Sequence, residues 1–133
     1  MVKSIEEHAS GINQMIKISE KELVSVSDDC TLKFWNASQM KVEMSISTET
    51  ITCIVNTGPR RDVLVAGCHS GNFITCRTDR RSKKDTVPLA HPNLVRVLVS
   101  LKQLNHRYFA SADVCGVVKV WYAEMRPQCV HQF

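Results

Sequence analysis

Residues 23–35 read LVSVSDDCTLKFW, and this stretch decides the fold. Apolar and polar residues alternate with a period of two on both sides of Asp28 and Asp29, which predicts two short strands joined by a tight polar turn. The same pattern recurs as VAGCHSGNFITC at residues 65–76 and as FASADVCGVVKVW at residues 109–121. We therefore expect three copies of one β-unit.

The three units end at Trp35, Cys76 and Trp121, which lie 41 and 45 residues apart. WD40 repeats have a period of about 40–45 residues. The run SDDCTLKFW that ends at Trp35 and the run GVVKVW that ends at Trp121 resemble the WD40 signature, and the resemblance covers essentially the whole chain. In place of the aspartate that completes the family's Trp-Asp pair, the chain has Asn36, Arg77 and Tyr122.

The resemblance implies an all-β fold: a partial β-propeller of three four-stranded antiparallel WD40-like blades. We place one propeller segment at 1–133, with blades at about 8–47, 48–90 and 91–133. The runs between the turns are rich in Val, Ile and Thr, as strands prefer, and no segment shows a sustained helical period. The predicted strands are Ile12–Ile18, Leu23–Ser27, Leu32–Trp35, Val42–Ile46, Ile51–Val55, Val63–Ala66, Phe73–Cys76, Thr86–Leu89, Val95–Leu101, Tyr108–Ala112, Val117–Trp121 and Cys129–Phe133.

The resemblance also implies a structural brace, a hydrogen-bonded His, Ser or Thr, Asp and Trp within a blade. A buried indole N–H needs an acceptor, and a carboxylate in the turn can hold one histidine tautomer. We expect Trp35→Ala to cost about 3–5 kcal/mol as a buried aromatic truncation. The first unit has all four residues as His8, Ser25, Asp29 and Trp35. The third has His91, Ser111 and Trp121, with Cys115 at the aspartate position, and the second has Ala66, Ser70 and Cys76 and hence no brace.

His8, Ser25 and Asp29 also match a catalytic triad by residue type. We favour the structural interpretation because Ser25 lies in the middle of a strand rather than on a strained elbow. Cys68 and His69 are adjacent on a strand and point to opposite faces, so they cannot easily share a metal ion. Since the sequence contains no phosphate loop or metal-ligand spacing, we expect no enzyme, no metal and no cofactor.

Seven basic residues between positions 60 and 84 form a basic patch. Only Asp62 and Asp79 oppose them, so this segment carries +5 while the whole chain carries +4. The patch falls in two connections of the second unit, which emerge at the same end of a four-stranded meander. Its members are Arg60, Arg61, Arg77, Arg80, Arg81, Lys83 and Lys84.

The basic patch supports a second functional interpretation. Clustered positive charge attracts phosphates, acidic protein tails and anionic lipid, so the alternative function is a binding module for a phosphate-bearing ligand, either nucleic acid or anionic lipid. A solvated loop and a nuclear-import signal are the other interpretations. No aromatic residue lies within 74–107, so the stacking platform of single-strand binders is missing, although contact with a duplex backbone stays open.

The composition, 44% hydrophobic and 23% charged, is that of a soluble globular protein. The N-terminus lacks the apolar core of a secretory signal. The richest apolar run, residues 94–101, is far shorter than the roughly 20 residues of a spanning helix, so we expect no membrane span. The six cysteines show no CxxC spacing. We expect reduced, mostly buried thiols and a cytoplasmic or nuclear location.

Propellers close into rings of about four to eight blades, and three blades leave open flanks. Val2–Ile5 could be the tail of a preceding blade's outer strand. A longer propeller, a six-bladed homodimer and insertion among another chain's blades all stay open. We expect a non-catalytic scaffold or adaptor that binds other proteins. The family's usual docking face corresponds here to Ser10, Asn13, Asp28, His69 and Val114.

Overall fold

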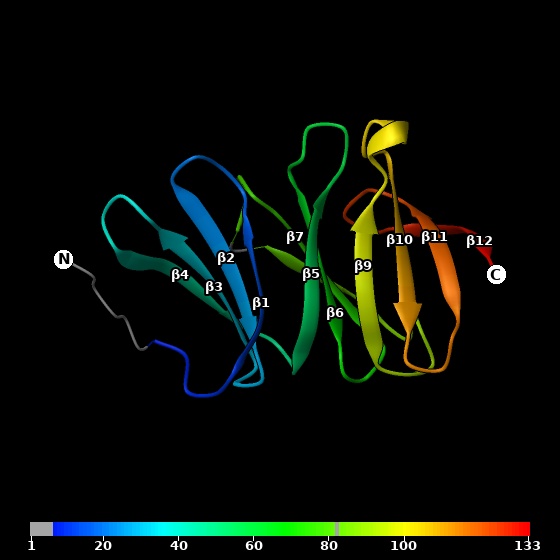
Figure 1. Cartoon of the computed structure of the whole chain (residues 1–133), viewed down its shortest axis with the longest axis horizontal. Coiled ribbons are helices and arrows are strands. Elements are labelled where there is room, and N and C mark those ends of the chain that lie inside the picture. The colour runs from blue at the N-terminus through cyan, green and yellow to red at the C-terminus, as the bar shows by residue number, and fades with distance from the viewer. Residues whose placement is uncertain (1–6, 82) are drawn as a thin grey trace.

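The computed structural model describes residues 7–81 and 83–133. These residues form twelve strands and one turn of 3-10 helix, η1 (Lys102–Leu104). The strands make three four-stranded antiparallel sheets, each a meander of sequential strands, and none of them closes on itself (Figure 1). The prediction of an all-β chain with three four-stranded sheets is confirmed.

Every predicted strand is present, with ends that agree within two residues. The expected strand at Val2–Ile5 lies outside the described residues. The first sheet contains β1 (Ile12–Lys17), β2 (Glu22–Ser27), β3 (Thr31–Asn36) and β4 (Lys41–Ser47). The second contains β5 (Ile51–Thr57), β6 (Val63–Cys68), β7 (Phe73–Arg77) and β8 (Lys84–Val87). The third contains β9 (Val95–Ser100), β10 (Tyr108–Asp113), β11 (Val118–Tyr122) and β12 (Gln128–Gln132).

The second sheet's outer strand, β8, begins and ends two residues earlier than predicted. Pro88 follows it and has no N–H for a sheet ladder. Leu89 then turns the chain with a positive φ of 49°. The η1 turn between β9 and β10 was not predicted, because three residues are too few to show a helical period.

The three sheets stand side by side, with the second between the other two and with β1, β5 and β9 as neighbouring inner strands (Figure 1). Polar side chains link these strands from sheet to sheet. Asn13 Nδ2 donates to the Ile51 carbonyl at 2.7 Å, and the Ile54 N–H donates to Gln14 Oε1 at 2.9 Å. The second and third sheets are linked by the Thr57 and Ser100 hydroxyls, 2.8 Å apart.

One hydrophobic core fills each of the two spaces between sheets. The middle strand β6 is buried along its whole length, and its side chains alternate between the cores. Leu64, Ala66 and Cys68 enter the core shared with the first sheet, whereas Val63 and Val65 enter the core shared with the third. The second sheet is therefore apolar on both faces, unlike the half-solvated sheets beside it.

The sheets pack on one another with the same orientation at both interfaces. We call the side that carries Trp35, Cys76 or Trp121 the indole face and the other side the back face. In the first core, the indole face of the second sheet, with Cys76, packs on Val24 and Phe34 of the first sheet's back face. In the second core, the indole face of the third sheet, with Trp121, packs on Val65 of the second sheet's back face. Val24 and Val65 occupy equivalent strand positions, so the two interfaces are copies of one arrangement.

This repetition leaves two faces uncovered in the described part of the chain. One is the indole face of the first sheet, where Met15 is 45% exposed and Trp35 is half-buried. The other is the back face of the third sheet, where Val97, Val99 and Tyr122 are 45%, 50% and 42% exposed. These two faces correspond to the two sides of the sheet–sheet interface, an indole face packed on a back face, that occurs twice within the chain.

A glycine sets how closely the second and third sheets approach. A Cβ at Gly67 would lie 2.5 Å from Val95 Cγ1 and 2.8 Å from Cys53 Sγ. We expect Gly67→Ala to destabilise the protein by about 1–3 kcal/mol through overpacking. The measurement is urea unfolding followed by far-UV circular dichroism. Gly11→Ala is the control, because nothing lies within 4 Å of its added Cβ; equal effects at both sites would contradict this account.

Candidate functional site

In the third sheet a buried chain of hydrogen bonds runs from a tryptophan to an aspartate. Trp121 Nε1 donates to Ser111 Oγ at 2.8 Å, Ser111 Oγ lies 2.5 Å from His91 Nε2, and His91 Nδ1 lies 3.3 Å from Asp113 Oδ2. An indole only donates and a carboxylate only accepts. A neutral His91 therefore donates from Nδ1 and accepts the Ser111 hydroxyl proton at Nε2.

The first sheet contains the same chain, as predicted. Trp35 Nε1 donates to Ser25 Oγ at 2.7 Å, and Ser25 Oγ lies 2.6 Å from His8 Nε2. His8 Nδ1 lies 2.8 Å from Asp29 Oδ2, which also accepts the Ala9 N–H at 3.0 Å. The structure thus brings all four predicted residues together.

In the third sheet, the assignment of the aspartate position to Cys115 is corrected: Asp113, two residues earlier, supplies the carboxylate. Residues i and i+2 of a strand share a face, so Asp113 at the end of β10 lies on the same side as Ser111 and reaches His91. Asp113 Oδ1 also accepts the N–H groups of Cys115 and Val117 at 2.9 and 3.0 Å. The presence of an aspartate in the run FASAD was the signal that could have identified it.

The second sheet lacks this chain, as predicted, because Ala66 and Cys76 replace the serine and tryptophan. Ser70 instead donates to Glu49, in the connection between the first two sheets. Burial raises the pKa of the Cys76 thiol to about 11. An apolar thiol in a dry core needs no polar partner, so the loss of the brace leaves no unsatisfied group there.

All six cysteines are free, in agreement with the expected reduced thiols. Cys53, Cys68 and Cys76 are buried, and burial raises the pKa of Cys68 to about 12. The expectation of burial is wrong for Cys115 and Cys129, which are exposed. Both lie at sheet margins, Cys115 in the β10–β11 turn and Cys129 on the outermost strand.

The two braces have equally buried serines but differ in the burial of their tryptophans. Ser25 and Ser111 are 0% and 2% exposed, so neither hydroxyl can reach a substrate. This favours a structural brace over a catalytic triad. Trp121 is 5% exposed and packs against Phe73 with ring centroids 5.0 Å apart, whereas Trp35 lies half-buried on the uncovered face. The expected cost of about 3–5 kcal/mol therefore belongs to truncation of Trp121, not to Trp35→Ala in the chain as it stands.

The carboxylates of both braces are held in the ionised form. Burial acts to raise the pKa of Asp29, but hydrogen bonds from Thr31, His8 and the Ala9 amide outweigh it and lower that pKa. In Asp113 burial is likewise outweighed by the Val117 and Cys115 amides and by His91, so its pKa is lowered. For His91 burial is the largest effect and lowers the pKa, against the opposing influence of Asp113.

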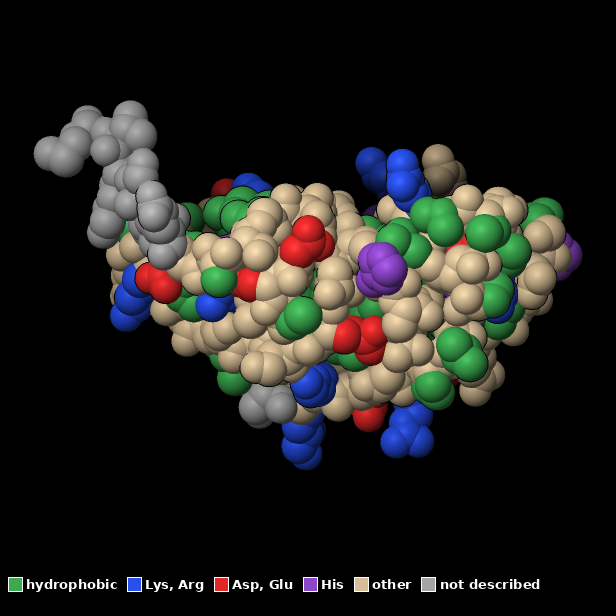
Figure 2. Space-filling model, turned by 90° about the horizontal axis from the view of Figure 1, so that it is seen from below, with side chains coloured by type: hydrophobic (Ala, Val, Ile, Leu, Met, Phe, Trp, Pro, Cys, Tyr) green, Lys and Arg blue, Asp and Glu red, His purple; other side chains and the backbone are tan. Residues whose placement is uncertain are grey.

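The five predicted partner-binding residues are all exposed, and they lie in or beside connections at one end of the sheets, the lower end in Figure 1. Viewed from this end, acidic, histidine and hydrophobic side chains are scattered over the face, with Lys and Arg mainly at its margin (Figure 2). Asn13 Nδ2 donates to Asp28 Oδ1 at 2.8 Å as well as to the second sheet. These five residues, Ser10, Asn13, Asp28, His69 and Val114, are called the rim below.

The basic patch lies at the other end of the sheets. The Thr78 N–H donates to the Asp62 carbonyl at 2.9 Å, so the two connections of the second sheet do meet at one end, as predicted. Arg77 pairs with Asp62 at 2.6 Å. Arg81 crosses to the first sheet, where it pairs with Glu22 at 2.5 Å and Glu43 at 3.0 Å.

Four of the seven bases therefore hold the fold together. Arg61 Nε donates to the Asn56 carbonyl at 3.1 Å, and Lys84 donates to the Ser47 carbonyl, in addition to the pairs of Arg77 and Arg81. Within residues 7–81 and 83–133, no side-chain hydrogen bond or ion pair engages Arg60, Arg80 or Lys83, and all three are exposed. These three carry the charge that is available to a ligand.

No protein-family model matches this chain, and no curated protein sequence matches it. None of the described helices is long and apolar enough to cross a membrane. Among the residues that the structure describes, no group of three or more His, Cys, Asp or Glu side chains is placed to hold a metal ion.

Loss of the serine at the centre of a brace tests its structural role. We expect Ser111→Ala to leave Trp121 Nε1 and His91 Nε2 without partners in a dry core, at about 1–3 kcal/mol for each unsatisfied group. Ser25→Ala is the matched variant and should cost less, because Trp35 is accessible to water. Urea unfolding measures both, and a larger loss for Ser25→Ala would contradict the assignment.

Acid should weaken the third sheet's brace through His91. Because burial lowers its pKa, the unfolded chain takes up this proton before the folded chain does. The contribution of neutral His91 to the free energy of unfolding is complete above the ordinary histidine pKa of about 6.5. It is lost as the pH falls from there toward the lowered pKa of His91 in the folded chain. We expect the melting temperature to fall between pH 7.5 and pH 5, with a shallower fall in His91→Asn. An unchanged slope in that variant would exclude His91 as the source.

Proposed function

We propose that the three sheets are successive blades of a WD40-type β-propeller and that the chain is a non-catalytic scaffold for other proteins. The observation that carries this proposal is the repeated packing of an indole face on the preceding back face. Radial repetition of one blade requires that relation at every interface. The Trp–Ser–His–Asp chains in the first and third sheets support it further.

The uncovered faces favour a ring completed by further blades, from the same chain or another. Each is the counterpart of a face that is buried inside the chain, and exposed apolar sheet faces favour association. Free thiols on the surface and in the cores fit a cytoplasmic or nuclear location, where thiols stay reduced. The rim is the docking face that we favour for partner proteins.

Sedimentation of the 133-residue chain tests ring completion. We expect self-association above the monomer mass of 15.0 kDa, because both uncovered faces favour burial. Val99→Glu places a charge in the back face of the third sheet and should shift the equilibrium toward monomer by at least tenfold in the association constant. Leu89→Glu changes a 70% exposed residue in the turn after β8 and is the control. A wild-type chain that sediments as a simple monomer contradicts ring completion by a second copy of this chain.

Affinity capture tests the rim as a docking face. Asp28→Arg with Val114→Arg should remove the partners that the wild-type chain retains. The matched control is Glu20→Arg with Leu104→Arg at the opposite end, because Leu104 and Val114 are 48% and 49% exposed. Unchanged partners in the rim variant, or equal losses in both variants, would count against this face.

A further inference from the structure

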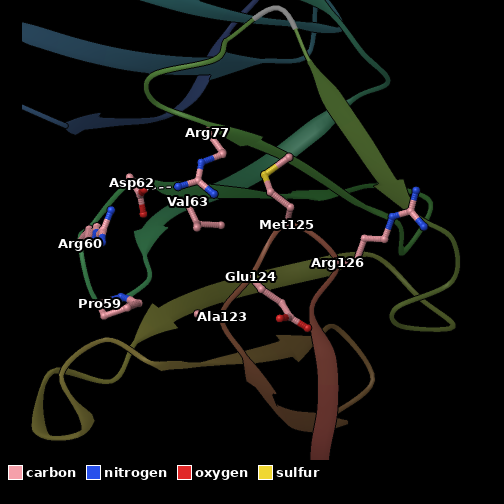
Figure 3. A pocket seen from close by; sticks show the side chains of 9 residues that line it. All are labelled: Pro59, Arg60, Asp62, Val63, Arg77, Ala123, Glu124, Met125 and Arg126. Carbon is pink, nitrogen blue, oxygen red and sulfur yellow. Dashed lines mark hydrogen bonds and ion pairs between the residues drawn. The ribbon is translucent and has the colours of Figure 1, made fainter.

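Two adjoining cavities form a groove at the basic end of the second and third sheets. One has a volume of about 500 Å³, and its walls come from the β5–β6 loop with Arg60, the end of β7 and the β11–β12 connection (Figure 3). The other has about 440 Å³ and includes Arg80 and Lys83. Arg77 and Met125 line both cavities, so the two meet at these side chains. We call this space the basic groove.

Of the basic side chains that line the groove, some are held in ion pairs and others have no described partner. Arg77, at its centre, is held by Asp62 at 2.6 Å (Figure 3) and, outside the residues drawn there, by Asp79 at 3.4 Å. At the two ends stand Arg60 on one side and Arg80 with Lys83 on the other, none of them engaged by a described side chain. The groove therefore has positive charges at both ends that no described side chain pairs with. At its centre, the charge of Arg77 is balanced by the two aspartates.

The centre also offers apolar surface. Val63 and Ala123 are buried, and with Met125 they line the groove between the charged ends. The Met125 carbonyl accepts the Thr75 hydroxyl at 2.6 Å, which fixes the β11–β12 connection against the second sheet. A ligand with anionic ends and a less polar middle would match this order of surfaces.

We propose that the basic groove binds a small organic molecule that carries at least two phosphate groups. One phosphate lies against Arg60, another lies against Arg80 and Lys83, and the organic body covers Met125. The volumes are those of small-molecule sites. An extended nucleic acid fits the groove less well, because Asp62, Asp85 and Glu124 interrupt the positive charge. This inference does not depend on the scaffold proposal.

Isothermal titration with 1,6-hexanediol bisphosphate, which carries one phosphate at each end of an apolar chain, as the probe tests the groove. We expect binding that weakens between 50 and 150 mM NaCl and that falls at least tenfold in Arg80→Ala with Lys83→Ala. Arg60→Ala should weaken it separately, since it removes the other end. The matched control, Lys41→Ala with Arg96→Ala, removes the same charge from exposed residues outside the groove and should stay within twofold of the wild type.

Several results would overturn the proposal. Absence of binding by the probe at 50 mM NaCl would exclude the site, and equal losses in the two double variants would show attraction to net charge alone. A 20-base-pair DNA duplex and vesicles with anionic phospholipid are titrated in parallel. Tighter binding to either, with the same sensitivity to Arg80 and Lys83, would assign the groove to that polyanion instead. Circular dichroism of each variant verifies that the sheets are intact.

Discussion

An antiparallel sheet with two apolar faces needs a neighbour on each side, and the second sheet of this protein obtains both from its own chain. β6 is buried from Val63 to Cys68, with alternate side chains in two cores. Burial of apolar area is the main favourable contribution to folding, at about 25 cal/mol for each Å². The first and third sheets each bury one face against the second sheet, so the folded structure of both depends on the second sheet.

The polar brace of the third sheet follows from this stacking. A tryptophan at the end of a sheet's third strand brings an N–H into the interface, and a buried donor without an acceptor is costly. In the third sheet Ser111, His91 and Asp113 satisfy it in sequence, all of them buried. In the second sheet Cys76 brings no such donor and needs no such chain. The absence of a brace there reflects the absence of the tryptophan.

The strands and the first brace could be predicted from the sequence, because period-two alternation and polar turns are local signals. The carboxylate at Asp113 could not be assigned by aligning turns, since a carboxylate at the end of the strand reaches the histidine of its brace, as one in the turn does in the first sheet. Nor could a charge count reveal that Arg81 is held by Glu22 and Glu43, which are distant in the sequence and meet it only after the sheets stack. Asymmetric burial of Trp35 and Trp121 likewise depends on which sheet has a neighbour.

The bridge from Arg81 to the first sheet has a geometric consequence. Asn13 and Gln14 tie the inner strands of the first two sheets together, while Arg81 ties their outer parts and lies 4.3 Å above the Phe34 ring. Because the two sheets are attached both at their inner strands and at their outer parts, the angle between them is fixed. In the propeller ring that we propose, that angle determines how many blades complete the turn, so Arg81 helps to set the number of blades.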